Sequence, residues 1–238
     1  MVTTDFGRAG CLLLATLLFP GCVDILDGNK VLTEELRDVR DFDRVNARGG
    51  LDVAISEGDF AVTVRIDENL MPYVRTSVRD DTLSVAVDDA NFRKKLPGPH
   101  VMISMPALRD AETTGEGNLT ATDFDVQGPV SLELTGAGKL SWSGRATDLD
   151  AVLAGSGQLS IEGSAENTEL FLRGSGTLDA RDLVADEATI VLDGPGELSV
   201  TVNGLVNARA ANGGSVDLFG RVQSGELDEA TGATITTH

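Results

Sequence analysis

The sequence is poor in the residues that build most catalytic centres. Among 238 residues there are 2 histidines and 2 cysteines, and the histidines are His100 and His238. A Ser-His-Asp or Cys-His arrangement, or a transition-metal cluster, needs several such side chains at recognisable spacings. The sequence therefore favours a protein that is not an enzyme and that carries neither a cofactor nor a metal ion.

Positive charge and aromatic side chains are also scarce. The chain has 19 Lys and Arg residues against 38 Asp and Glu residues, a formal net charge of -19, and 4% aromatic residues. Such a surface repels nucleic acid, which argues against DNA or RNA as a partner. The core must be built from Val, Leu, Ile and Ala, which favours β-strands. A divalent cation on the acidic surface is the less favoured alternative, because its oxygen ligands would have to converge.

The N-terminus lacks a hydrophobic run long enough to cross a membrane, but it carries a short one. Residues 11–19 are almost entirely apolar and have the length of a signal-peptide core. Phe19-Pro20-Gly21-Cys22 resembles a bacterial lipobox, which implies cleavage before the cysteine and its acylation. We therefore predict a signal peptide over residues 1–21 and lipidation of Cys22. A soluble export signal with an incidental cysteine is the alternative.

The expected cleavage has consequences for the mature N-terminus. Cys22 becomes the single cysteine, so no intramolecular disulfide can form. Asp24 lies two residues after Cys22 rather than next to it, which favours the outer membrane over inner-membrane retention. Residues 22–38 are rich in Asp and Glu without strand alternation, and we predict a lipidated tether or cap. The expected location is the bacterial cell envelope, with the lipid anchor in the membrane.

Glycine, in contrast, is abundant and recurs in the phrase Gly-x-Gly-x-Leu. Five copies and two weaker ones follow at steps of 21, 19, 19, 20, 18 and 19 residues, beginning at Gly115, Gly136, Gly155, Gly174, Gly194, Asn212 and Thr231. A fixed period near twenty is the signature of stacked coils. The predicted fold is all-β, with a parallel β-helix of about 19–20 residues per coil in the C-terminal half of a domain that covers residues 39–238.

The glycines are interpreted as corners of the coils. A corner with positive φ costs a non-glycine residue about 1 kcal/mol or more, and Asn, which tolerates this region, replaces the first glycine at residue 212. A phosphate-binding loop is rejected because no helix pattern and no third glycine follow. The predicted corner residues are Gly115, Gly117, Gly136, Gly138, Gly155, Gly157, Gly174, Gly176, Gly194, Gly196, Asn212 and Gly214.

Alternation at period two predicts which side chains face the interior of a coil. In the coil from Gly155 they are Leu159, Ile161, Thr168, Leu170 and Leu172. Trp142 falls in an inward column and is interpreted as a core residue, with a sugar-stacking platform as the alternative. Each coil is expected to consist of two or three short strands joined by turns.

The chain before the repeats is expected to form antiparallel hairpins. Segments 51–55 and 62–66 flank one turn, and segments 74–78 and 83–87 flank another. A further strand ends at Pro106. The basic cluster Arg93, Lys94 and Lys95 is interpreted as a solvated loop, with an anion-binding patch as the alternative.

Segments on both sides of these hairpins resemble a bacterial family. They are Phe42-Asp43-Arg44-Val45 with Gly50-Leu51-Asp52-Val53-Ala54-Ile55, and Ile103-Ser104-Met105-Pro106-Ala107-Leu108 with the glycine series behind it. About residues 39–237 are similar to the family called putative auto-transporter adhesin, head GIN domain. The resemblance implies a single-stranded, right-handed β-helix in a secreted or lipid-anchored envelope protein. The family's function is unknown, so no active residues are carried over.

The outward columns beside the coil leucines are mostly polar. The column after each leucine reads Thr120, Ser141, Ser160, Asp179, Ser199 and Asp217, and the column before it reads Asn118, Lys139, Gln158, Thr177, Glu197 and Ser215. They are interpreted as a solvated face. Binding of sugar hydroxyls or a cation, for example between Asp179 and Asp217, is the alternative.

These patterns favour a non-enzymatic binding or adhesion module of the cell envelope, with an envelope polysaccharide or protein as its partner. A polysaccharide-active enzyme is the first alternative, since many β-helices act on polysaccharides through converging carboxylates. A self-associating scaffold is the second, because exposed coil edges or flat faces would allow a homo-oligomer.

Overall fold

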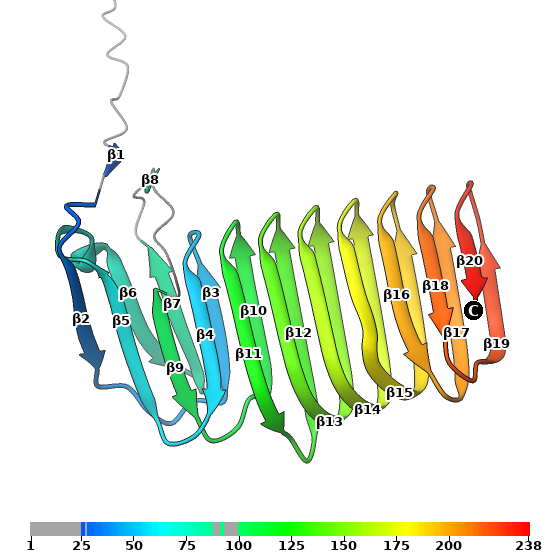
Figure 1. The fold of residues 1–238 in the computed structure, drawn as a ribbon, viewed down its shortest axis with the longest axis horizontal. Helices are drawn as coiled ribbons and strands as arrows, with labels where there is room; N and C mark the ends of the chain where they lie inside the picture. Colours follow the sequence, from blue (N-terminus) through cyan, green and yellow to red (C-terminus); the bar gives the residue numbers. More distant parts are fainter. Residues whose placement is uncertain (1–24, 27, 88–90, 93–99) are drawn as a thin grey trace, which may run out of the picture.

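The chain forms an elongated β-solenoid that is closed at its N-terminal end by a mixed sheet (Figure 1). The computed structural model describes residues 25–26, 28–87, 91–92 and 100–238. About seven turns stack along the long axis of Figure 1. The predicted all-β class and the parallel β-helix in the C-terminal half are confirmed.

The N-terminal part contains nine strands and one short 3-10 helix. They are β1 (Ile25–Leu26), β2 (Leu32–Arg37), β3 (Arg44–Arg48), β4 (Asp52–Glu57), β5 (Ala61–Asp67), η1 (Glu68–Tyr73), β6 (Val74–Arg79), β7 (Thr82–Val87), β8 (Asn91–Phe92) and β9 (Val101–Met105). The solenoid strands are β10 (Asp110–Gly115), β11 (Asn118–Asp125), β12 (Pro129–Gly136), β13 (Lys139–Gly155), β14 (Gln158–Gly174), β15 (Thr177–Asp193), β16 (Glu197–Val202), β17 (Leu205–Ala211), β18 (Ser215–Phe219), β19 (Gln223–Glu229) and β20 (Thr234–Thr237).

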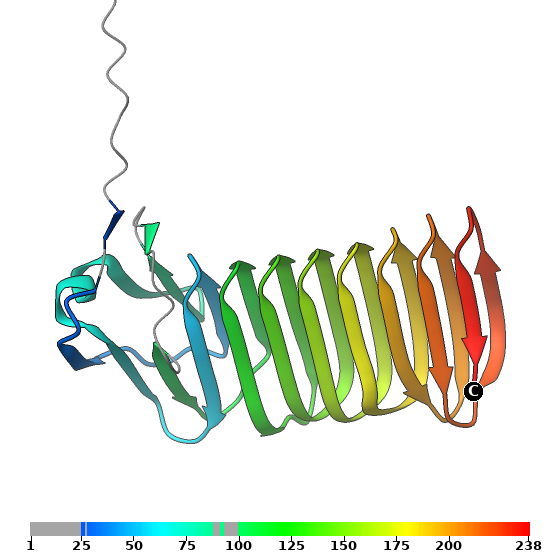
Figure 2. The same ribbon diagram turned by 45° about the horizontal axis from the view of Figure 1, so that its top comes forward.

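Each coil has one strand that runs toward a glycine corner and one that leaves it. Strands running toward the corners form what we call the ascending sheet: β3, β10, β12, the second halves of β13, β14 and β15, then β17 and β19. Strands leaving the corners form the descending sheet: β4, β11, the first halves of β13, β14 and β15, then β16, β18 and β20. All these pairs are parallel, and Figure 2 separates the two layers.

The three central coils differ from the expected set of short strands. β13, β14 and β15 are each one continuous strand of 17 residues that bends from the descending to the ascending sheet. The register between β13 and β14 runs through the bend, where Gly144 lies opposite Gly163. Hydrogen bonding to the neighbouring coil therefore keeps the backbone extended around this end, and only the glycine end is a sharp turn.

The predicted corner residues lie where an ascending strand gives way to a descending one. The first glycine of each full copy has positive φ, for example 120° at Gly174, and Asn212 has a φ of 63°. The second glycine meets a different constraint, because a Cβ at Gly176 would lie 2.6 Å from the carbonyl oxygen of Gly157 in the preceding coil. One position is thus limited by its dihedral and the other by the close approach of stacked backbones.

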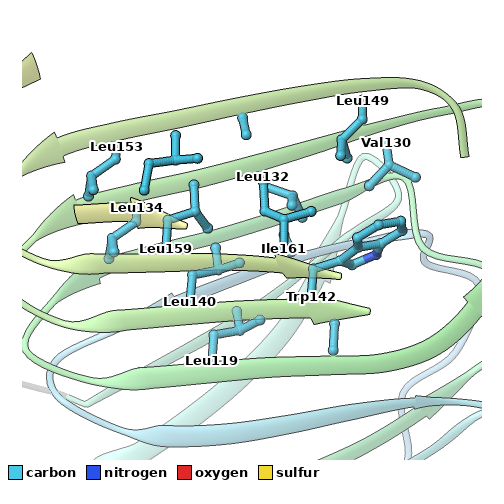
Figure 3. Close-up of a cluster of buried hydrophobic side chains, with 14 of the residues drawn as sticks. Leu119, Val130, Leu132, Leu134, Leu140, Trp142, Leu149, Leu153, Leu159 and Ile161 are labelled. Carbon is cyan, nitrogen blue, oxygen red and sulfur yellow. The ribbon is translucent and has the colours of Figure 1, made fainter. Parts of the chain in front are cut away.

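Ladders of like residues fill the interior (Figure 3). Leu119, Leu140 and Leu159 lie opposite one another in successive coils, and each is at most 1% exposed. Trp142 points into the core and is 1% exposed. The interior residues expected for the coil from Gly155 are all buried. Because the coils are about 4.8 Å apart, each interior side chain packs on its counterparts above and below.

The N-terminal sheet corrects one of the two predicted hairpins. β4 and β5 do not pair, because β9 lies between them, parallel to β4 and antiparallel to β5. Alternation shows that a strand is half-buried but not which strand lies beside it, so the expected hairpin over residues 51–66 is wrong. The second hairpin, β6 with β7, is confirmed, and Asp80 and Asp81 take positive φ in its turn.

The segment expected to be a tether or cap contains β2, which pairs antiparallel with β5. Leu32 and Leu36 on β2 are 51% and 71% exposed. No residue of β2 is fully buried, so neither face of the strand needs a row of apolar side chains, and its sequence does not alternate between apolar and polar residues. Residues 1–21, Cys22 and the basic cluster at residues 93–95 lie outside the described residues, so the signal peptide and the lipidation stay predictions.

The corner geometry predicts which substitutions the fold tolerates. We expect Gly174→Val to lower the free energy of unfolding by about 2–4 kcal/mol, because it adds positive-φ strain and overpacks against Gly155 of the coil before. The neighbouring Ser175→Ala should change it by less than about 0.5 kcal/mol, since Ser175 is exposed. Urea unfolding of both variants tests this, and equal effects would contradict the role of the corner.

Candidate functional site

The outer face of the descending sheet carries the two polar columns predicted from the sequence. The register places Asn118, Lys139, Gln158, Thr177, Glu197 and Ser215 in one ladder. The second ladder contains Thr120, Ser141, Ser160, Asp179, Ser199 and Asp217. Short hydroxyl and amide side chains dominate, so this face presents little apolar area to a partner.

The two aspartates of that face are committed to other partners. Asp179 accepts two bonds from the Arg181 guanidinium, at 2.6 and 2.9 Å, and this contact lowers the pKa of Asp179. Asp217 lies 2.7 Å from Nε2 of His238. Ser199 separates the two aspartates in the ladder, a spacing of about 9–10 Å. A glycosidase acid needs a raised pKa, so Asp179 has the opposite property.

The outer face of the ascending sheet is different in character. Val152, Phe171 and Val191 lie opposite one another on β13, β14 and β15, point outward and are partly exposed. We call these three residues the apolar stripe. Glu169 and Arg173 flank Phe171 on the same face of β14, and both are exposed.

A hollow of about 350 Å³ lies beside the apolar stripe. Its polar lining includes Asp148, Asn167, Glu169, Glu187, Thr189 and Asn207, and Leu205 contributes an apolar wall. We call it the polar depression. Its amide and hydroxyl groups can donate hydrogen bonds and its three carboxylates can accept them, on the same face of the sheet as the aromatic ring of Phe171.

Carboxylates crowd the same face toward the N-terminal end of the solenoid. Glu112 lies opposite Glu133 in the neighbouring coil, and Asn46 donates a hydrogen bond to Glu112. Burial raises the pKa of Asp110, and the charges of Glu112 and Glu133 add to that rise. Within the described residues, no group of three or more His, Cys, Asp or Glu residues is arranged to hold a metal ion.

This face was not among the positions predicted from the sequence. The predicted polar columns lie beside the coil leucines and belong to the descending sheet. In the segment Asp150-Ala151-Val152-Leu153, the outward Val152 and the inward Leu153 are both apolar, so the sequence pattern does not mark Val152 as a surface residue. A signal was present nonetheless, because Phe171 occupies an outward position between the inward Leu170 and Leu172.

The chain matches one protein family and is similar in fold to several solved structures. The family model described as "Putative auto-transporter adhesin, head GIN domain" matches residues 41–221. Similar solved structures include a putative adhesin from Bacteroides fragilis (TM-score 0.78, 19% identity, covering 90% of this chain and 100% of that one). A putative lipid binding protein from Parabacteroides distasonis is also similar (0.68, 20%, 90% and 100%), as is a putative adhesin from Parabacteroides merdae (0.63, 18%, 90% and 99%).

At these identities the structural similarity shows the fold alone. A search of curated proteins found no match. Within the part of the chain that the structure describes, no helix has the length and apolar character needed to cross a membrane.

The crowded carboxylates predict a pH-dependent stability. We expect Asp110→Asn to stabilise the fold more at pH 7 than at pH 4. The folded protein holds the Asp110 proton to a higher pH than the unfolded chain does, so stability falls as the pH rises from about 4 through the raised pKa. The Asn variant avoids this loss. Thermal unfolding at the two pH values measures the difference.

Asp179→Asn provides the matched control for this prediction. Because the Arg181 guanidinium lowers the pKa of Asp179, the stability it contributes is present at neutral pH and is lost on acidification. Asp179→Asn should therefore destabilise the protein at pH 7. The same pH response in both variants would contradict the assignment of opposite pKa shifts.

Proposed function

The chain belongs to the putative auto-transporter adhesin, head GIN domain family, and on this basis we propose that it is a non-enzymatic binding module of the bacterial cell envelope. Its partner is held on the outer face of the ascending sheet. The observation that carries the proposal is the apolar stripe beside the polar depression, a combination that the polar ladders of the descending sheet do not offer.

The two features of this face have complementary roles. The side chains of Phe171, Val152 and Val191 gain about 25 cal/mol for each Å² of apolar surface that a partner covers. The amide and carboxylate groups of the polar depression then fix the partner's orientation through hydrogen bonds. An envelope polysaccharide, with its hydroxyl groups and apolar ring faces, and a protein surface both have this chemistry.

The enzyme alternative has less support. Among the described residues the aspartates of the descending face are engaged, Asp179 by Arg181 and Asp217 by His238. Asp110, whose pKa is raised by burial and by the charges of Glu112 and Glu133, does not line the polar depression.

The envelope location is part of the same proposal and depends on the N-terminus. The predicted signal peptide and Cys22 would connect the solenoid to a membrane, with the outer membrane favoured. Several acyl chains on one residue give the stable anchoring that a single chain does not.

The binding proposal predicts a face-specific effect of charge. We expect Phe171→Glu to weaken binding of the full chain to isolated envelopes by about tenfold or more, because it removes an aromatic anchor from the centre of the contact. Ser160→Glu, on the descending face, is the matched control and should bind like the wild type. Co-sedimentation with envelopes and, separately, with extracted envelope polysaccharide measures both variants. Equal binding of the two variants would contradict the choice of face.

Removing the thiol of Cys22 tests the predicted lipid anchor in the cell envelope. We expect Cys22→Ala to move the protein from the membrane fraction to the soluble periplasmic fraction, because the variant cannot be acylated. Fractionation with immunoblotting measures this, and Cys11→Ala, inside the predicted signal peptide, is the control that should keep its membrane association. Unchanged membrane association of Cys22→Ala would show that the lipobox interpretation is wrong.

A further inference from the structure

Three carboxylates beside the apolar stripe have no cationic partner in the chain. Glu133 lies opposite Val152 in the neighbouring coil, and Asp150 and Glu169 lie two residues before Val152 and Phe171 on the same outer face. Within the part of the chain that the structure describes, none of the three carboxylates forms an ion pair. The surroundings of the apolar stripe are therefore negatively charged.

The register makes this arrangement unfavourable for the free protein. Asp150 lies directly opposite Glu169, and Glu112 lies directly opposite Glu133. Like charges that face each other across two strands destabilise a sheet. The raised pKa of Asp110 reflects the same crowding, because the charges of Glu112 and Glu133 add to the effect of its burial. A local conflict of this kind is expected where a surface serves a partner.

The descending sheet of the same coils shows that the acidity of the chain does not by itself account for this crowding. In β13, β14 and β15 its two polar ladders contain one cation, Lys139, and one carboxylate, Asp179, which is bonded to Arg181. On the ascending halves of these strands the outward charged residues are Asp148, Asp150, Glu169, Glu187, Asp193 and Arg173. The excess of negative charge thus belongs to the face that carries the apolar stripe.

We propose that the partner held on the ascending sheet is a basic polypeptide segment, whose lysine or arginine side chains cross the apolar stripe and reach the carboxylates beside it. The inference rests on the proposed function, since it names the chemical class of the partner for that face. Outward residues on one strand are about 6.8 Å apart, which separates Glu169 from Phe171. Lysine and arginine carry a cationic head on a long apolar stem, so one side chain can cover the ring and bring its charge to the carboxylate.

The residues around the ring favour the same partner. A cation above an aromatic ring is attracted by the ring's negative face, and Val152 and Val191 offer apolar area to the stems on either side of Phe171. Arg173, exposed on the other side of Phe171 from Glu169, can donate hydrogen bonds to backbone carbonyl oxygens of the segment. The apolar stripe covers two coil spacings, about 10 Å, which accommodates two alternate residues of an extended chain.

Polysaccharides fit this face less well. A polymer of amino sugars carries its amino groups on the ring itself, so a sugar ring stacked on Phe171 would hold its charge over the apolar stripe rather than at Glu169. A neutral polysaccharide would leave the repulsion between Asp150 and Glu169 unrelieved. The separation between the apolar stripe and the carboxylates therefore selects a partner whose charge lies at the end of a stem.

Binding of a defined basic peptide to the full chain tests the site. The probe is a fluorescein-labelled peptide of alternating lysine and serine, measured by fluorescence anisotropy at physiological ionic strength. The double variant Asp150→Asn/Glu169→Gln should raise the dissociation constant about tenfold or more, because it removes two charges from ion pairs that the partner partly covers. The same peptide with acetylated lysines keeps its stems but loses its charge, and should bind the wild type about tenfold more weakly or worse.

A matched variant separates this site from the general acidity of the chain. Glu162→Gln/Glu197→Gln on the descending sheet removes the same charge from exposed positions and should bind the peptide as the wild type does. Phe171→Ala tests the contribution of the ring and should weaken binding of the peptide severalfold. Equal binding of the peptide to the two double variants, or stronger binding of a soluble glucosamine polymer than of the peptide, would overturn the inference.

Envelope binding separates this inference from the proposed function. If the peptide distinguishes the two double variants but Phe171→Ala binds envelopes as the wild type does, the basic-peptide site stands and the envelope-binding function fails. If Phe171→Ala loses envelope binding but the peptide binds both double variants equally, the binding face stands and a basic polypeptide is the wrong partner.

Discussion

The spacing of about 4.8 Å between hydrogen-bonded coils is the constraint on which the rest of this structure depends. It brings the carbonyl oxygen of one corner so close to the next that a Cβ at Gly176 cannot be accommodated. It also places Leu140 on Leu159 and Trp142 on Ile161, so the core is a set of columns rather than a single packed centre. Small departures inside one coil are therefore transmitted only to its neighbours.

This constraint explains how much of the fold could be predicted from the sequence. The glycine phrase revealed the coils because the corner is demanding in every turn, and period two then identified the inward columns, including Trp142. The hairpin expected over residues 51–66 failed because β9, from residues 101–105, pairs between its two strands. Such an insertion is a long-range choice, and no local pattern of β4 or β5 encodes it.

The candidate site was harder to predict for a related physical reason. Outward side chains are not restricted by the corner or by core volume, so they vary from coil to coil and leave no periodic signal. Val152, Phe171 and Val191 become one surface only through the parallel register of β13, β14 and β15. The sequence did predict the polar columns of the descending sheet, but these columns form the face with less apolar area for a partner to cover.

The two faces differ in what their side chains are required to do. The interior repeats because stacking requires it, whereas polar outward residues such as Ser141, Ser160 and Ser199 need only tolerate contact with water. An outward Phe171 contributes less to folding than a buried one, since part of its ring stays in water. Its position between Glu169 and Arg173 makes sense when another surface covers it, because only then does the ring lose its contact with water and do the two charges gain partners.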